Sequence, residues 1–149
     1  MHKDSYDKKL LREYINDQIS GKIKTLQFYL KFTLDATKEV KKTSKYDSIR
    51  EEMQEEIYHL DKQMAHLKQM QISMRRVLAT ESDEVRLGAL VLTNKARFYI
   101  SVSLGEFFFE GERFYAISLE SPMAQIMLGK KVGDAFILNG IRQEIERII

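Results

Sequence analysis

The sequence has no cysteine, and it has only one proline and seven glycines in 149 residues. Without cysteine, the chain cannot form a disulfide scaffold, a thiolate zinc site or a cysteine nucleophile. The three histidines, His2, His59 and His66, are too few and too scattered to predict a metal site. There is no glycine-rich phosphate loop and no nucleophile paired with a base, so an independent enzyme has little support. We expect the chain to have no cofactor of its own.

Neither sign of charge dominates, and long apolar runs are missing. The formal net charge is +2, which does not predict the basic surface typical of nucleic-acid-binding proteins. No window approaches the roughly 18 consecutive apolar residues of a transmembrane helix, and the first residues lack the apolar run of a signal peptide. Because 44% of the residues are hydrophobic and 31% are charged, we expect a globular cytoplasmic protein with a core and no membrane partner.

The first half of the chain has the pattern of long helices. Between Ser5 and Leu78 there is no proline, and Gly21 is the sole glycine. Positions that are mostly apolar, with two threonines and one glutamine, recur at alternating steps of three and four, as in a coiled coil. The first series is Ile19, Ile23, Leu26, Leu30, Thr33, Thr37 and Val40, and the second is Ile57, Leu60, Met64, Leu67, Gln71, Met74 and Leu78.

The two series are separated by residues 38–47, where apolar residues thin out. Thr43, Ser44 and Asp47 are suitable caps for a second helix, which would run from about residue 46 to residue 77. Two such helices joined by a short connection fold back on each other. We therefore predict an antiparallel helical hairpin over residues 1–79, with an exposed tip.

The second half of the chain has a different pattern, which begins after a polar linker at residues 79–84. It contains short segments rich in β-branched and aromatic residues, separated by turn signals. The predicted strands are residues 85–93, 96–103, 113–118, 135–138 and 141–149, the predicted two-residue turns are 94–95 and 139–140, and a loop is predicted around Gly105 and Gly111. We predict a small antiparallel β domain over residues 80–149.

The proline and two of the glycines lie in the stretch SPMAQIMLGKKVGD, residues 121–134. Ser121 is a suitable N-cap, and Pro122 stands at the first helical position, where its missing N–H costs nothing. Gly129 can take the left-handed conformation that ends a helix, and Gly133 with Asp134 suits a turn. The stretch predicts a helix of about two turns, so the fold class is α+β.

Within the longer run ISLESPMAQIMLGKKVGDAFIL, the same stretch resembles the C-terminal domain of the Gre family of bacterial transcript-cleavage factors, which has a run of the type IS-x-x-SP-[LI]-[GA]-x-A-LLGKKVGD. VRLGALVLT, residues 85–93, resembles the opening strand of that domain. In the Gre family a helical hairpin precedes a C-terminal domain of the FKBP-like type. The resemblance thus implies an N-terminal antiparallel helical hairpin, or coiled coil, followed by a small FKBP-like antiparallel β domain with one short helix.

The resemblance also implies a partner, bacterial RNA polymerase. In the Gre family the C-terminal domain docks beside the secondary channel of the polymerase, and the hairpin presents acidic side chains near the catalytic magnesium. Carboxylates are suitable there because Mg²⁺ prefers oxygen ligands. The docking or motif residues that carry over to this chain are Ser121, Pro122, Met123, Ile126, Gly129, Lys130, Lys131, Gly133 and Asp134.

The hairpin tip departs from the family pattern, which is of the type D-L-K-E-N-A-E-Y. When the chain is aligned on Tyr46, Glu39 falls at the first acidic position, but Lys42 and Lys45 replace acids. With Lys41, these are the residues expected to face the polymerase active site. Residues 38–45 contain four lysines and one glutamate, and an ammonium group repels a metal ion by roughly 4 kcal/mol per unit charge pair at about 4 Å and an effective dielectric constant of about 20. We predict a protein that modulates elongation or initiation, does not stimulate cleavage efficiently and has no catalytic residues of its own. Any magnesium ion near its tip would be bound by the polymerase, and its contact with nucleic acid would be indirect.

Two other functions remain open at this point. The hairpin could dimerise in a protein with no polymerase partner, and a monomer or weak dimer fits the sequence. An FKBP-like fold also suggests an isomerase or chaperone, but so small a domain needs its aromatic residues for the core. Because Phe107, Phe108 and Phe109 cannot all face one core, at least one is expected to point outward, toward a possible partner surface.

Overall fold

The computed structural model describes residues 5–40 and 42–149. The chain divides into two compact units. The hairpin unit is Asn16–Ile72, and the β-rich unit combines the described residues up to Ile15 with Ser73–Ile149. This division differs from the boundary expected at residue 79, because the first turns of the N-terminal helix belong to the β-rich unit.

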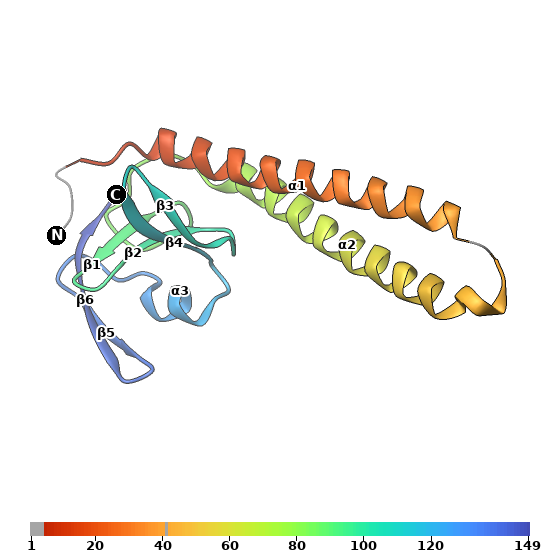
Figure 1. Ribbon diagram of the computed structural model, residues 1–149. Helices are drawn as coiled ribbons and strands as arrows, with labels where there is room; N and C mark the ends of the chain where they lie inside the picture. The colour runs from red at the N-terminus through yellow and green to blue at the C-terminus, as the bar shows by residue number, and fades with distance from the viewer. Residues whose placement is uncertain (1–4, 41) are drawn as a thin grey trace. The chain divides into compact units, whose positions relative to one another are not determined.

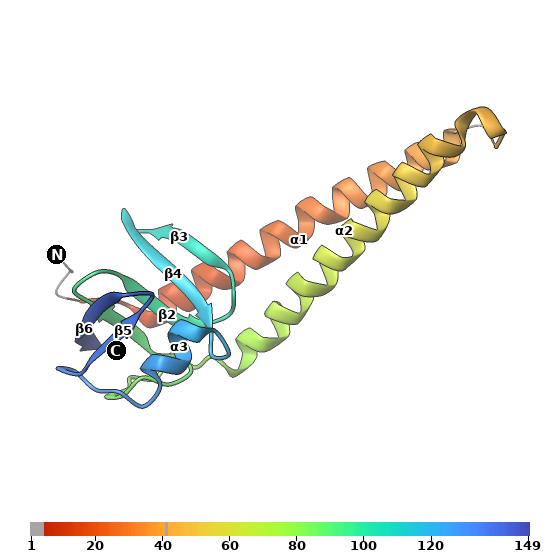
Figure 2. The same cartoon turned by 90° about the horizontal axis from the view of Figure 1, so that it is seen from below.

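Helices α1 (Lys8–Glu39) and α2 (Asp47–Ser73) lie side by side in the hairpin unit (Figures 1 and 2). Their shared seam buries apolar residues in the half of the unit that is farther from the turn. These buried residues are Ile19, Ile23, Leu60, Met64, Leu67 and Met70. The predicted antiparallel hairpin is therefore confirmed.

The seam is thinner toward the turn, where its residues are half-buried. Thr37 lies opposite Met53, with its Oγ1 at 3.6 Å from the sulfur atom, and its hydroxyl also donates to the carbonyl of Thr33 at 2.8 Å. Two positions assigned to the seam from the sequence are wrong, because Gln71 and Leu78 are exposed. Met70 occupies the seam in place of Gln71. Leu78 lies beyond the end of α2 at Ser73, so the helical spacing no longer applies to it.

Within the described residues, the β-rich unit contains one six-stranded sheet with the order β3-β4-β2-β1-β6-β5. The strands are β1 (Leu90–Thr93), β2 (Arg97–Ser101), β3 (Gly105–Phe109), β4 (Glu112–Ser118), β5 (Ala135–Leu138) and β6 (Ile141–Ile148). Four of the neighbouring pairs are antiparallel. The pair β2–β4 is parallel, which the sequence did not predict.

Two segments differ from the strands predicted for them. The first predicted strand is shorter, since β1 begins at Leu90. The predicted loop before β4 is instead strand β3, joined to β4 by a tight turn. Glu110 and Gly111 have φ values of 51° and 80° in that turn, as a two-residue hairpin of the mirror-image type requires.

The three consecutive phenylalanines alternate along β3. Phe107 is buried, Phe108 is 55% exposed and Phe109 is half-buried. The prediction that at least one of them points outward is confirmed by Phe108. The alternation follows from the two-residue period of a strand.

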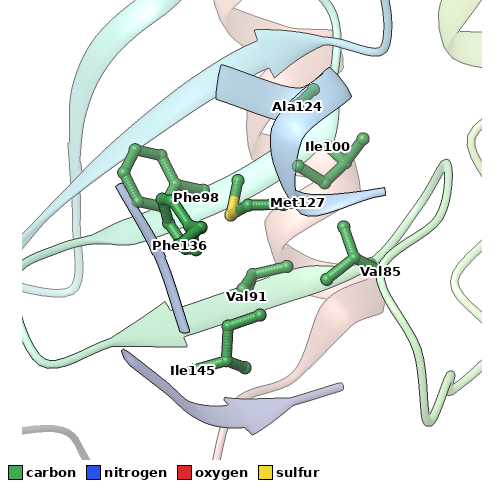
Figure 3. Close-up of a cluster of buried hydrophobic side chains, with 9 residues drawn as sticks. Val85, Val91, Phe98, Ile100, Ala124, Met127, Phe136 and Ile145 are labelled. Atoms are coloured by element: carbon green, nitrogen blue, oxygen red, sulfur yellow. The ribbon is translucent and has the colours of Figure 1, made fainter. Parts of the chain in front are cut away.

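The core of the β-rich unit lies between the sheet and helix α3 (Pro122–Met127), which contributes Ala124 and Met127 (Figure 3). The buried cluster is Val85, Ala89, Val91, Phe98, Ile100, Ala124, Met127, Phe136 and Ile145. The first turns of α1 also bury Leu11 and Ile15 within this unit. The arrangement confirms the predicted fold class, a helical hairpin followed by a small β domain with a short helix.

None of the helices in the described ranges combines the length and apolar character that crossing a membrane requires.

Candidate functional site

The tip of the hairpin is built from a tight turn between the two helices. Helix α1 ends at Glu39. A single turn of 3-10 helix, Ser44–Tyr46, then leads directly into α2 at Asp47. Thr43 precedes this turn with an extended backbone, and its carbonyl accepts the backbone N–H of Tyr46 at 3.0 Å. Thr43 thus holds the predicted capping position, but its side chain makes no capping hydrogen bond.

Arg50 stabilises the turn and was missed in the sequence. Its guanidinium forms an ion pair with Asp47, three residues earlier. It also donates to the carbonyl oxygen of Thr43 at 3.2 Å. The i, i+3 spacing of opposite charges was the available signal. The contact compensates the charge of the acidic residue that begins α2.

The predicted tip residues that the structure describes are mostly exposed. Glu39, Lys42 and Lys45 are exposed and Tyr46 is half-buried, while Lys41 lies outside the described residues. The ammonium of Lys45 lies 5.7 Å from the centre of the Tyr46 ring. This is a cation–π contact, in which the ring attracts the positive charge. The surface that results is cationic.

No group of three or more histidine, aspartate or glutamate side chains that could hold a metal ion occurs in residues 5–40 and 42–149. At the tip, Glu39 is exposed and Asp47 is paired with Arg50. The described tip therefore offers lysine donors for anionic oxygens, rather than a set of oxygen ligands for a cation.

A second candidate surface surrounds α3 in the β-rich unit. The hydroxyl of Ser121 accepts the backbone N–H of Ala124 at 3.1 Å, and Pro122 occupies the first helical position. Gly129 has a φ of 80°, the left-handed conformation that ends the helix. The predicted start and end of the short helix are confirmed.

Several motif residues hold the chain after α3 through their backbone. Val85 donates to the carbonyl of Lys130 at 2.9 Å and accepts from Gly129 at 2.8 Å. Gly133 donates to the carbonyl of Ile145 at 2.9 Å, and the carboxylate of Asp134 accepts the N–H of Lys131 at 2.8 Å. These contacts confirm the predicted turn before β5, and they give the motif a structural role.

The side chains of the motif differ in exposure. Met123 and Ile126 are half-buried and pack against the core, and Lys130 is half-buried, whereas Lys131 is exposed. Four apolar side chains near these residues in sequence, or in the β5–β6 hairpin, are exposed, and none of them is among the predicted docking residues. They are Leu128, Val132, Ile137 and Ile141. For Ile137, the period of two along a strand was the signal, because its neighbour Phe136 is buried.

The aromatic residues of the β-rich unit serve mainly as core. Phe98, Tyr99, Phe107 and Phe114 are buried. A surface depression of about 420 Å³ touches Phe108 and Tyr115, but charged side chains line much of it, among them Arg97 and Glu112. Those two form an ion pair at 2.5 Å. The depression differs from the aromatic-lined pocket that an isomerase needs.

Lys8, at the start of α1, is a buried cation with only 5% of its surface exposed. Its ammonium donates to the carbonyl of Thr80 at 2.6 Å and to that of Ile149 at 2.9 Å. Burial, and then the positive charge of Arg86, lower the pKa of Lys8 to about 8, although Glu81 acts in the opposite direction. Lys8 thus fixes the first turn of α1 within the β-rich unit.

No family model matches the chain, and no curated protein matches it. Among solved structures, one similar structure is described as that of the transcription factor Gfh1. It is 19% identical to this chain, the alignment covers 88% of this chain and 89% of that one, and the TM-score is 0.37. At that identity and TM-score, the similarity does not bear on function.

Proposed function

We propose that this chain is a Gre-like regulator of bacterial RNA polymerase that acts at the secondary channel and modulates elongation or initiation without efficient stimulation of transcript cleavage. The observation that carries the proposal is the exposed cationic tip of the hairpin. Lys42 and Lys45 are exposed there, and Arg50 neutralises Asp47. Such a tip suits contact with the acidic magnesium-binding loop of the polymerase or with phosphates of the nucleotide or the RNA.

The proposed docking surface lies around α3 and the loop after it. Support comes from the run of residues 117–134, which resembles the Gre family and which the structure folds into a capped helix and a tight turn. Lys131 and Val132 are exposed beside this turn. The exposed apolar side chain can be buried in an interface, while the charged one lies in its polar rim.

Cleavage assays on stalled elongation complexes test the role of the tip. We expect the chain to slow nucleotide addition and to leave the transcript uncut. Lys42→Ala and Lys45→Ala should each weaken the slowing several-fold at unchanged polymerase binding, because each removes one charge from the tip. Lys22→Ala, on the side of the hairpin and also exposed, is the matched control. Robust cleavage that persists in Glu39→Ala and Lys42→Ala would contradict the argument.

Binding to core polymerase tests the docking surface separately. We expect Lys131→Glu and Val132→Ser to weaken binding by about tenfold each, which corresponds to about 1.4 kcal/mol. Leu78→Ser alters an apolar side chain outside the α3 region that is 59% exposed, against 57% for Val132, and should leave binding unchanged. If the wild-type chain does not bind polymerase at all, the proposed function is wrong.

A further inference from the structure

One face of α1 carries exposed aromatic side chains that the hairpin does not use. Phe28 and Phe32 are 66% and 65% exposed, and Tyr29 is 52% exposed. The rings of Phe28 and Tyr29 contact each other, with centroids 5.8 Å apart. Neighbouring aromatic residues of this size are seldom left in water on one helix face unless a partner covers them.

These aromatic residues belong to a second stripe along α1, distinct from the buried seam. Its members are separated by alternating steps of four and three residues, and all of them are exposed. We call it the outer stripe, and it consists of Gly21, Thr25, Phe28, Phe32, Asp35 and Glu39. Phe28 and Phe32 form the apolar centre of the stripe, the part that a second helix packed along it would remove from water.

Gly21 strengthens the case for an external contact. A methyl group added at this position would meet no atom within 4 Å, so the packing of the hairpin does not require a glycine. Glycine nevertheless weakens a helix interior relative to alanine. A close approach by a second helix is a physical reason for a residue without a side chain on this face.

We propose that two copies of this chain associate through the outer stripe, with their α1 helices antiparallel and a twofold axis at position 30. The charges on and beside the stripe are arranged for such a pairing. Lys22 and Lys24 lie near one end of the stripe, while two acids, Asp35 and Glu39, lie with one lysine, Lys38, at the other. A twofold axis makes contacts reciprocal, so an antiparallel pair places the basic end of one copy beside the acidic end of the other.

The aromatic residues fit the same register. Position 28 faces position 32 of the second copy, so that Phe28 of each copy meets Phe32 of the other. Lys24 reaches Asp35 of the second copy, one layer farther from the axis. In a parallel pair each lysine would instead lie beside the same lysine of the second copy, and like charges repel.

The expected dimer is weak and depends on concentration. Three aromatic side chains per copy cover less than the roughly 800 Å² per partner of a standard interface. The association rests on a different observation from the proposed function and its test needs no polymerase, but the stripe ends at Glu39, so both use the tip end of α1.

Sedimentation of the full-length chain over a range of concentrations tests the proposal. We expect a reversible monomer–dimer equilibrium in the micromolar range. The double variant Phe28→Ser with Phe32→Ser should weaken it by more than about a hundredfold, because the aromatic area is no longer removed from water. Tyr58→Ser is the matched control, since Tyr58 is an exposed aromatic residue of α2. Circular dichroism should show unchanged helicity in both variants.

A charge exchange tests the register. Lys24→Asp and Asp35→Lys should each weaken the dimer by about tenfold at low salt, because each places like charges together twice per dimer. The double exchange should restore it. A wild-type chain that stays monomeric at all concentrations would refute the proposal, as would a dimer unaffected by the phenylalanine substitutions or a double exchange that fails to restore association. If the wild-type chain is monomeric and the phenylalanine variant loses polymerase binding, the outer stripe contacts the polymerase instead. That result would also refute the dimer.

Discussion

Replacing Lys8 with methionine should change how the stability of the protein depends on pH. The ammonium of Lys8 is buried and donates to the carbonyl oxygens of Thr80 and Ile149. Burial lowers its pKa from 10.5 to about 8 in the folded chain. Methionine has a similar length and no titratable group, so it removes the proton equilibrium while filling most of the space.

The sign of the effect follows from proton binding in the two states. Above about pH 8 the folded chain releases the proton of Lys8, while the unfolded chain keeps it up to a pKa of 10.5. Since the unfolded state then binds more protons, the free energy of unfolding rises with pH. The rise amounts to at most about 2 kcal/mol between about pH 8 and about pH 9.5. It is lost again as the pH falls toward 8.

Urea denaturation at several pH values in this window measures the effect. The wild-type chain should become more stable as the pH rises, and Lys8→Met should show a flatter profile. Lys9→Met, at the exposed neighbouring position, should keep the wild-type slope. An identical slope in the wild type and in Lys8→Met would refute the reasoning, whatever the absolute stability of the variant.

Other substitutions test separate features by the same denaturation measurement. Burial raises the pKa of Tyr99 to about 12, so wild-type stability should fall as pH rises from about 10 to about 12, and Tyr99→Phe should remove this fall. Tyr99→Phe should also stabilise by about 1 kcal/mol, because its buried hydroxyl has no hydrogen-bond partner among the described residues. Ser121→Ala should cost about 1 kcal/mol through the lost N-cap; no loss would contradict the capping role. Gly88→Ala should cost about 2 kcal/mol or more, since Gly88 has a φ of 92° and a methyl group there would lie 2.8 Å from the Leu78 carbonyl. Gly21→Ala should instead stabilise by about 1 kcal/mol.

The features that could be predicted from the sequence are those decided by neighbouring residues. The start of α3 depends on Ser121 and Pro122, and its end depends on Gly129, all within a few positions of the helix. The turn at Asn139 and Gly140 has φ values of 52° and 76°, as a two-residue hairpin of this type requires. Local signals of this kind need no knowledge of the rest of the chain.

The features that could not be predicted depend on distant contacts. Strand β3 was missed because three phenylalanines in succession hide the apolar and polar alternation of a strand. The parallel pairing of β2 with β4 joins Phe98 to Tyr115, and no local pattern sets that choice. The heptad pattern likewise could not separate Leu11 and Ile15, which pack in the β-rich unit, from the hairpin residues that follow.

The candidate site divides in the same way. The exposed charge of Lys42 and Lys45 could be predicted, because a short connection between two helices lies at the surface. The pairing of Arg50 with Asp47 and with the carbonyl of Thr43 could not, since the geometry of the turn decides it. The docking function of the α3 region stays a prediction.

Helix α1 is continuous from Lys8 to Glu39, yet its first turns belong to the unit completed by β6. During synthesis the hairpin can therefore form while the sheet is still on the ribosome, because its contacts are close in sequence. The β-rich unit must wait for its last strand in chain order, since Lys8 bonds to Ile149 across 141 positions. A nascent chain would thus have a folded hairpin preceded by a segment that is not yet packed. Until the sheet forms, Leu11 and Ile15 would be exposed to water and would be the residues for a chaperone to bind.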